Sequence, residues 1–286
     1  MAASEVALVS YHAIPALNPT YKYERLGQMA LVRHQQYCDL HGYTFIVGKQ
    51  VDDGCHACWQ KIPALLEVLE EYPWVCWVDS DVLIGNMSIP LTEFIDPRYD
   101  LISQCPETFL RPLGWTKEQC YGQMLLNTGV FLIKNSAWSR DVLTQAYAKR
   151  QRVLADEPWD GLGEQEAMLE VIRDQQQGLA RIGYHPHLQA HPKYGTPGDF
   201  GLHFYGNFAA HRIPNRESLA IIDRWEGRIL EGGDLPADRA RFHYASIQFK
   251  EFQPVNDRKN PEFFLYSEEE IEKVSRNSIH QPCPLP

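Results

Sequence analysis

The chain has 286 residues, of which 44% are hydrophobic and 22% are charged, as in an ordinary globular protein with one large α/β domain or two small ones. Its 37 acidic and 27 basic residues give a formal net charge of −10. This balance argues against a nucleic-acid partner, because such surfaces need a basic patch. No run of about 18 apolar residues is present, so the sequence predicts no transmembrane segment.

Apolar runs and helix-period patterns alternate along the first part of the chain. Short apolar runs that end in polar breaks predict buried strands, and apolar side chains repeating every three or four residues predict helices. This alternation predicts right-handed crossovers and a parallel sheet covered by helices. The expected strands are residues 6–10, 44–47 and 74–78, and the expected helices are residues 23–41, which Gly42 is expected to end, and 59–72.

The second half of the chain continues the pattern. Gly129 lies inside an expected strand, where it predicts a bulge or the close approach of a ligand. Ser136 is expected to cap the helix that follows. Arg33, in the first helix, is expected on the surface. The further strands are expected at residues 101–103 and 125–133, and the further helices from Ser136 to about residue 154, at 164–172 and at 218–230.

These elements predict one α/β domain over residues 1–250, with a mostly parallel central sheet between helices. The polar segment 251–286 is expected to be a loosely attached extension. Residues 1–10 lack the basic and apolar segments of a signal peptide. We therefore expect a soluble, cytoplasmic chain as the sequence stands, with the Golgi lumen as the alternative if a membrane anchor has been trimmed from it.

Two aspartates, Asp79 and Asp81, directly follow the apolar run at residues 74–78. Carboxylates at the end of a buried strand are costly unless a positive group meets them. Mg²⁺ or Mn²⁺ fits this position, because these ions prefer carboxylate oxygens and because ligands bind at strand ends in open α/β sheets. The pattern predicts a metal-dependent enzyme acting on a phosphorylated donor, and a solvated turn is the alternative.

Several short segments between residues 6 and 212 together resemble glycosyltransferase family 34, the galactosyl/mannosyl/xylosyltransferase group. The resemblance implies a Rossmann-like GT-A fold. It also implies retaining transfer of a hexose or pentose from a nucleotide-diphosphate sugar to a glycan or other hydroxyl acceptor, with a UDP-sugar favoured and a GDP-sugar as the alternative. The matching segments are Tyr37-Cys38 with His41-Gly42-Tyr43, Trp59 to Pro63, Trp77 to Asp81, Leu126 to Ile133 with Asn135 to Ser139, Glu164-Gln165, and His203-Phe204 with Gly206.

The resemblance implies a metal site made of Asp79, Asp81 and His203. Asp81 is the first choice for a direct ligand, and Asp79 is expected either to bind the metal through water or to hold the donor ribose. One imidazole among oxygen ligands favours Mn²⁺, with Mg²⁺ as the alternative. The other interpretation of His203 is a hydrogen-bonded core histidine.

Donor contacts are expected from residues near the same strand ends. Ser10 and Tyr11, at the end of the first strand, are assigned to the nucleotide, and Ser80 is assigned to the donor site together with Asp79. Lys61, at a helix start, is expected to pair with a phosphate, and the alternative is a solvated helix lysine. Gly129 is expected to let the backbone approach the sugar.

Catalytic roles are expected for Asn127, Glu164 and Gln165. Asn127 offers a donor and an acceptor to the sugar. Glu164 stands where the family usually has aspartate, and with Gln165 it is expected near the anomeric carbon. Retention then proceeds either by double displacement, with a carboxylate nucleophile, or by a front-face route. Glu164 could instead be an N-terminal helix carboxylate favoured by the helix dipole.

Two other functions fit parts of the pattern. A sugar nucleotidyltransferase would share the fold, but such enzymes usually carry a Gly-rich basic loop after the first strand, and Ser10-Tyr11-His12-Ala13 stands there instead. A non-catalytic protein that binds sugar nucleotides or carbohydrate is the second alternative. The paired aspartates favour the enzyme over both.

Overall fold

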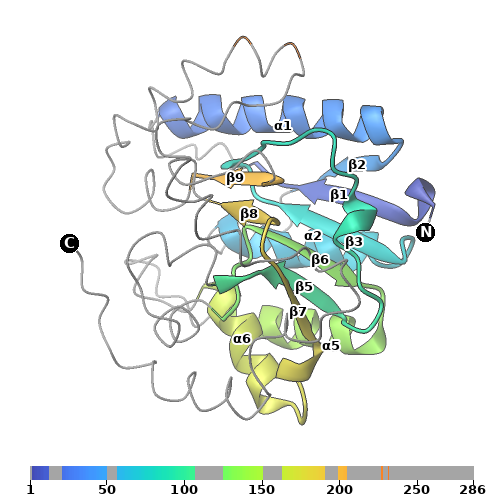
Figure 1. Ribbon diagram of the computed structural model, residues 1–286. Coiled ribbons are helices and arrows are strands. Elements are labelled where there is room, and N and C mark those ends of the chain that lie inside the picture. The colour runs from blue at the N-terminus through green and yellow to red at the C-terminus, as the bar shows by residue number, and fades with distance from the viewer. Residues whose placement is uncertain are drawn as a thin grey trace.

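A six-stranded sheet lies at the centre of the protein (Figure 1), in the order β2-β1-β3-β6-β5-β7. The computed structural model describes residues 2–12, 21–49, 57–106, 125–150, 163–190 and 199–204, together with Gly227 and Glu231. The strands of the central sheet are β1 (Val6–Ser10), β2 (Thr44–Val47), β3 (Trp74–Val78), β5 (Leu101–Gln104), β6 (Val130–Lys134) and β7 (Ile182–His185).

A three-stranded sheet stands beside the central one, in the order β4-β9-β8. Strand β4 (Val82–Ile84) follows β3 after a short turn and pairs antiparallel with β9 (Gly201–His203). Strand β8 (Gln189–Ala190) pairs with β9 in parallel. This small sheet therefore places the turn after β3 beside a segment from much later in the chain.

Helices cover both faces of the central sheet, with α1 on one side and α5 and α6 on the other (Figure 1). In β3, Val75 and Trp77 belong to the apolar core shared with α2, α5 and α6, whereas Trp74, Cys76 and Val78 belong to the core shared with α1 and β4. A strand that is buried on both faces reads as an uninterrupted apolar run. The helices are α1 (Tyr21–His41), α2 (Lys61–Val68), α5 (Ala137–Ala148) and α6 (Glu164–Asp174), with 3-10 turns η1 (Ala3–Glu5), η2 (Ala57–Gln60), η3 (Leu91–Glu93) and η6 (Leu179–Arg181).

The predicted α/β class with a mostly parallel central sheet is confirmed, and one strand of the sheet is reversed. Strand β6 runs antiparallel to both of its neighbours, β3 and β5, while β2-β1-β3 and β5-β7 are parallel sets. Apolar pattern does not encode strand direction, so the sequence did not reveal this reversal. The strand expected over 125–133 starts only at Val130, the helix expected over 59–72 is η2 followed by α2, and the helix capped by Ser136 ends at Ala148.

The structure confirms the predicted cap of α5 but does not describe the C-terminal segments. Ser136 caps α5 as predicted, since its Oγ accepts a hydrogen bond from Ser139 N at 3.1 Å. The helix expected over 218–230 lies outside the described residues apart from Gly227, and so do the boundary at residue 250 and the extension 251–286. Within the described ranges, no helix combines the length and apolarity that crossing a membrane requires.

The sequence suggested a surface position for Arg33, but this residue of α1 is fully buried. Its guanidinium donates hydrogen bonds to the carbonyl oxygens of Ile84 and Gly85 at the end of β4. Five fixed donors allow one arginine to satisfy several carbonyl groups that leave a strand. The contact ties α1 to the small sheet, as does the hydrogen bond between the His34 ring and Val82 O at 2.9 Å.

Gly42 ends α1 in the left-handed conformation, with φ of 73°. Among the described residues, a Cβ atom at this position would meet only the Ala3 Cβ, at 3.9 Å, so it is the backbone conformation that disfavours a side chain here. We predict that Gly42→Ala lowers the free energy of unfolding by about 1–2 kcal/mol, measured by urea denaturation. Gly42→Asn should lose less, because asparagine tolerates this conformation better; equal losses in the two variants would contradict the explanation.

Candidate metal and donor site

The turn between β3 and β4 holds both aspartates. Asp79 N donates to Gly129 O at 2.8 Å, and Val82 N donates to Asp79 O at 3.1 Å. These two bonds close the turn and leave the carboxylates of Asp79 and Asp81 on the same side as the end of β9. Backbone hydrogen bonds within the protein therefore fix this turn without a bound ligand.

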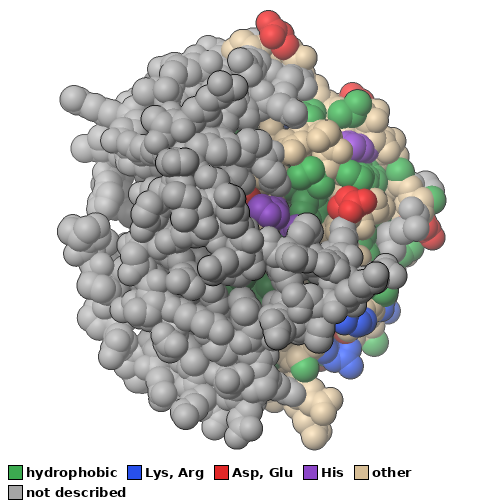
Figure 2. All heavy atoms as spheres, in the orientation of Figure 1, with side chains coloured by type: hydrophobic (Ala, Val, Ile, Leu, Met, Phe, Trp, Pro, Cys, Tyr) green, Lys and Arg blue, Asp and Glu red, His purple; other side chains and the backbone are tan. Residues whose placement is uncertain are grey.

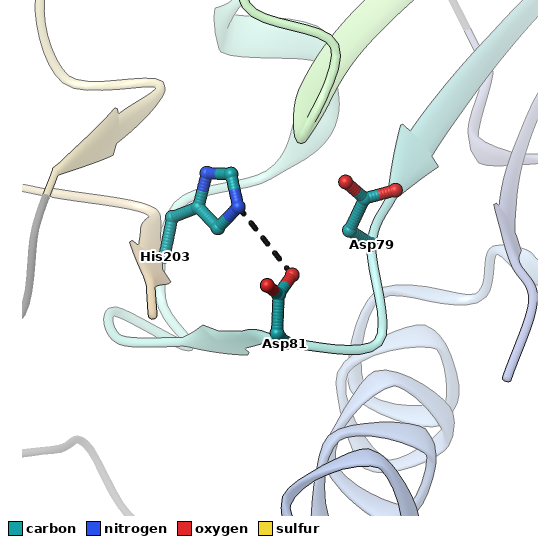
Figure 3. A group of neighbouring side chains, drawn as sticks. All are labelled: Asp79, Asp81 and His203. Carbon is teal, nitrogen blue, oxygen red and sulfur yellow. Dashed lines mark ion pairs between the residues drawn. The ribbon is translucent and has the colours of Figure 1, made fainter. Parts of the chain in front are cut away.

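His203 completes a group of three candidate metal ligands (Figure 3). It lies opposite Val82 in the β4-β9 ladder, so the side chain reaches Asp81 from a neighbouring strand. His203 Nε2 is 3.4 Å from Asp81 Oδ1. One ligand atom from each of Asp79, Asp81 and His203 lies within 4.8 Å of the others. These three side chains are called the metal group below. Figure 2 shows a histidine side chain near the middle of the face that is drawn, with an acidic side chain partly visible beside it.

The donor set fits a divalent cation. Asp81 Oδ1 is buried and makes no hydrogen bond within the described part of the chain, and a buried carboxylate oxygen in that state is costly. Burial and the nearby Asp81 charge raise the pKa of Asp79 above its ordinary value, against the effect of Lys61. Burial also disfavours the Asp81 carboxylate, but the His203 ring outweighs it, and the pKa of Asp81 is lowered. A cation would relieve the repulsion between the two carboxylates.

Gly129 leaves the space that the His203 ring occupies. A Cβ atom on Gly129 would lie 2.2 Å from His203 Cε1 and 2.5 Å from Nδ1, which is far inside van der Waals contact. The close approach expected at this glycine is therefore made by a histidine of the same protein. The contact places the start of β6 against the metal group.

Lys61 is buried, which excludes the solvated helix lysine considered from the sequence. Its ammonium donates to Glu164 Oε1 at 2.6 Å and to Thr128 O at 2.8 Å, and it lies 3.1 Å from Asp79 Oδ1. Burial lowers the pKa of Lys61, but the charges of Asp79 and Glu164 outweigh it and leave the pKa raised. One cation therefore bridges the metal group and the start of α6.

Glu164 is held in its charged form by the same contacts. Its Oε1 also accepts a hydrogen bond from Thr128 Oγ1 at 2.9 Å. Burial raises the pKa of Glu164, but the Lys61 ammonium and the hydrogen bonds from Lys61, Cys58 and Thr128 lower it overall. Glu164 is thus an anchored carboxylate rather than one turned to solvent.

The segment before β6 is pinned by the other residues expected to be catalytic. Asn127 is buried, and its Oδ1 accepts from Gly129 N at 2.9 Å. Gln165 Oε1 accepts from Thr128 N at 3.0 Å. Asn127, Gln165, Glu164 and Lys61 therefore all meet the loop that leads into β6.

The expected nucleotide residues lie at the end of β1. Ser10 is fully buried, and its Oγ makes no hydrogen bond within the described ranges. Tyr11 packs against the core shared with α2. Ser80 Oγ is 3.2 Å from His12 Nδ1, which connects the strand end to the Asp-Ser-Asp turn.

Several residues of the site had no assigned role in the sequence analysis, among them His12, Thr128 and Gln189. Thr128 stood inside a matched segment, and its position between Asn127 and Gly129 could have marked it. Gln189 Oε1 is 2.9 Å from His203 Nδ1, and no local pattern pointed to it. The short strand that carries it, β8, was also not predicted.

Comparison with known proteins identifies the family. The sequence profile described as the galactosyl transferase GMA12/MNN10 family matches residues 16–212. The chain belongs to this family. The membership confirms the resemblance stated from the sequence. The matched range contains Asp79, Asp81 and His203, whereas Ser10, Tyr11 and His12 precede it.

Curated relatives match a shorter part of the chain. Xyloglucan 6-xylosyltransferase 4 of Arabidopsis thaliana is 31% identical over 117 residues, which is 37% of this chain and 20% of that protein. Probable glycosyltransferase 6 of Oryza sativa subsp. indica is 35% identical over 116 residues, which is 37% of this chain and 22% of that protein. The chain thus matches about a fifth of the length of these relatives.

A solved structure shares the fold. It is a glycosyltransferase involved in the glycosylation of the major capsid of PBCV-1, with a TM-score of 0.51 and 19% identity, covering 72% of this chain and 96% of that one. At this identity the likeness shows the fold alone. It confirms the GT-A architecture expected for the family.

The contact between Gly129 and His203 gives a test of the site geometry. We predict that Gly129→Ala lowers the free energy of unfolding by about 1–3 kcal/mol, the usual cost of overpacking. In a His203→Ala background the same substitution should cost much less, because the added methyl group then enters vacated space. A double-mutant cycle by urea denaturation measures the coupling, and additive effects would show that the two residues are not in contact.

Proposed function

We propose that the chain is a metal-dependent, retaining glycosyltransferase that moves a hexose or pentose from a nucleotide-diphosphate sugar to a hydroxyl group of a glycan or other acceptor. Membership of the galactosyl transferase GMA12/MNN10 family supports the transfer of sugar. A UDP-sugar is the proposed donor, with a GDP-sugar as the alternative. Xylosyl transfer is the activity named for the Arabidopsis relative and supports a sugar-transfer reaction here.

The group of Asp79, Asp81 and His203 is the observation that carries the metal proposal. Two carboxylates and one imidazole around one point form a mixed oxygen and nitrogen donor set, which suits Mn²⁺ better than Mg²⁺. When bound, the ion would supply Lewis-acid stabilisation of the negative charge on the departing diphosphate. We propose Asp81 and His203 as direct ligands and Asp79 as a ligand that Lys61 and Trp77 orient, since Trp77 Nε1 donates to Asp79 Oδ1 at 2.6 Å.

The contacts of Lys61 support a role different from the one expected. Its ammonium has three hydrogens, and Glu164, Thr128 and Asp79 lie around them at 2.6 to 3.1 Å. Pairing with a donor phosphate would require one of these contacts to break. We propose that Lys61 orients Asp79 and Glu164, and that Ser10, Tyr11 and Ser80 contact the nucleotide part of the donor.

The environment of Glu164 supports a front-face route. A double displacement needs a carboxylate oxygen free to attack the anomeric carbon, whereas Glu164 Oε1 accepts hydrogen bonds from Lys61 and Thr128. Hydrogen bonds and a paired cation stabilise the carboxylate and weaken it as a nucleophile. We propose that Glu164 anchors the loop and that Asn127, Gly129 and Gln165 form the polar pocket around the transferred sugar.

Asp81→Asn tests the metal proposal. The variant should lose Mn²⁺-dependent thermal stabilisation and orders of magnitude of transfer activity, because the amide keeps the shape and removes the charge. A chelator should abolish wild-type activity and Mn²⁺ should restore it. Asp141→Asn, at an exposed carboxylate of α5, is the matched control and should behave as wild type. Full Mn²⁺-dependent activity in Asp81→Asn would refute the site.

Glu164→Ala tests the route of retention. Under the front-face proposal, added azide does not rescue the variant, and mass spectrometry of the wild-type protein during turnover finds no sugar attached to Glu164. We also expect the substitution to lower the free energy of unfolding by about 3 kcal/mol, because Lys61 loses a buried partner. Azide rescue with formation of a glycosyl azide would instead identify Glu164 as the nucleophile.

A further inference from the structure

Gln189 is a fully buried residue of β8 that contacts His203 from the side opposite the metal group. Its Oε1 lies 2.9 Å from His203 Nδ1, and its Nε2 lies 3.5 Å from Val130 O. A buried polar side chain is retained where it satisfies other buried polar groups. Here the glutamine links the imidazole to the backbone of β6.

The register of the small sheet explains how Gln189 reaches the ring. Gln189 pairs with Gly201 in the parallel β8-β9 ladder. Side chains two residues apart on a strand share a face, so Gly201 and His203 present the same face to Gln189. A Cβ atom at Gly201 would lie 3.1 Å from Val82 Cγ1 and 3.2 Å from Val130 Cγ2, so the position opposite Gln189 has little room for a side chain.

The orientation of the amide follows from its two partners. Val130 O is an acceptor only, so the NH₂ group of Gln189 must face it, and the amide oxygen then faces His203. That oxygen accepts a hydrogen, so His203 carries its proton on Nδ1. The reversed amide would place two carbonyl oxygens against each other.

A metal binds the uncharged imidazole, and in that form this tautomer directs the Nε2 lone pair at Asp81. The two atoms, Nε2 and Asp81 Oδ1, are 3.4 Å apart, and both are then acceptors. A cation between them removes the conflict. Histidine metal ligands generally donate their other N–H to a protein acceptor that fixes the tautomer and the ring orientation.

We propose that Gln189 is a positioning residue, which selects the Nδ1–H tautomer of His203 and so presents Nε2 to the divalent cation. This role rests on the metal site of the proposed function. Gln189 does not itself touch the metal or the substrate.

The test compares two substitutions of similar size. Gln189→Met removes the acceptor, and Gln189→Glu keeps an acceptor oxygen facing Nδ1. Mn²⁺ alone is titrated into each purified chain and the free ion is followed by electron paramagnetic resonance. We expect Gln189→Met to bind Mn²⁺ about 10- to 100-fold more weakly than wild type, and Gln189→Glu to recover most of the affinity.

A control and a second readout separate positioning from loss of fold. Gln104→Met replaces another buried glutamine, in β5, and should leave Mn²⁺ affinity unchanged. Nitrogen-15 NMR of metal-free, histidine-labelled protein, with the His203 signal assigned by a His203→Asn variant, should show the Nδ1–H tautomer in wild type and a changed pattern in Gln189→Met.

The outcomes distinguish two failures. If wild type binds Mn²⁺ and Gln189→Met binds it equally well, or if the His203 ring of wild type carries its proton on Nε2, the role of Gln189 is refuted while the metal site stands. If wild type binds no Mn²⁺, the proposed metal site is refuted, and the role of Gln189 in presenting His203 to the metal is refuted as well.

Discussion

The buried ammonium of Lys61 is the interaction on which the site depends. It stands at the first residue of α2 and contacts the turn after β3, the loop before β6 and the first residue of α6. Buried carboxylates are stable only when paired and hydrogen-bonded. The positions of Asp79 and Glu164 are therefore set by one cation, which three other parts of the chain contact.

The rest of the site is built outward from that point. Thr128 connects Lys61 to Glu164, and Gly129 connects the same loop both to Asp79 through its backbone and to His203 through its missing side chain. The polar groups thus form one connected network. Networks of this kind hold their members rigidly when every polar group has a partner. Under the metal proposal, the partner of Asp81 Oδ1 is the bound cation.

Sequence reasoning succeeded where a pattern was long or chemically distinctive. The apolar run of β3 followed by Asp79 and Asp81 predicted both the strand and the acidic turn, and the helical spacing of residues 23–41 predicted α1. It missed β4, β7, β8 and β9, because strands of two to four residues carry little periodic pattern. The direction of β6 was also invisible, since an apolar strand buried on both faces looks the same in either orientation.

Side-chain partnerships were harder to predict than side-chain identities. Arg33 looked like a surface residue because nothing local showed that the carbonyl groups of β4 would need a donor there. Lys61 was placed near the strand ends, but its partners come from segments far away in sequence. Gln189 gave no signal at all, since its role exists only through its register with Gly201.

The pairing of β4 with β9 also has a consequence for biosynthesis. Both aspartates leave the ribosome with the first third of the chain, and the strands of the central sheet are complete once β7 has been made. His203 follows only afterwards, on β9. A nascent chain that has made all strands of its main sheet therefore still lacks His203, and the group of three candidate ligands is complete only when β9 docks beside β4.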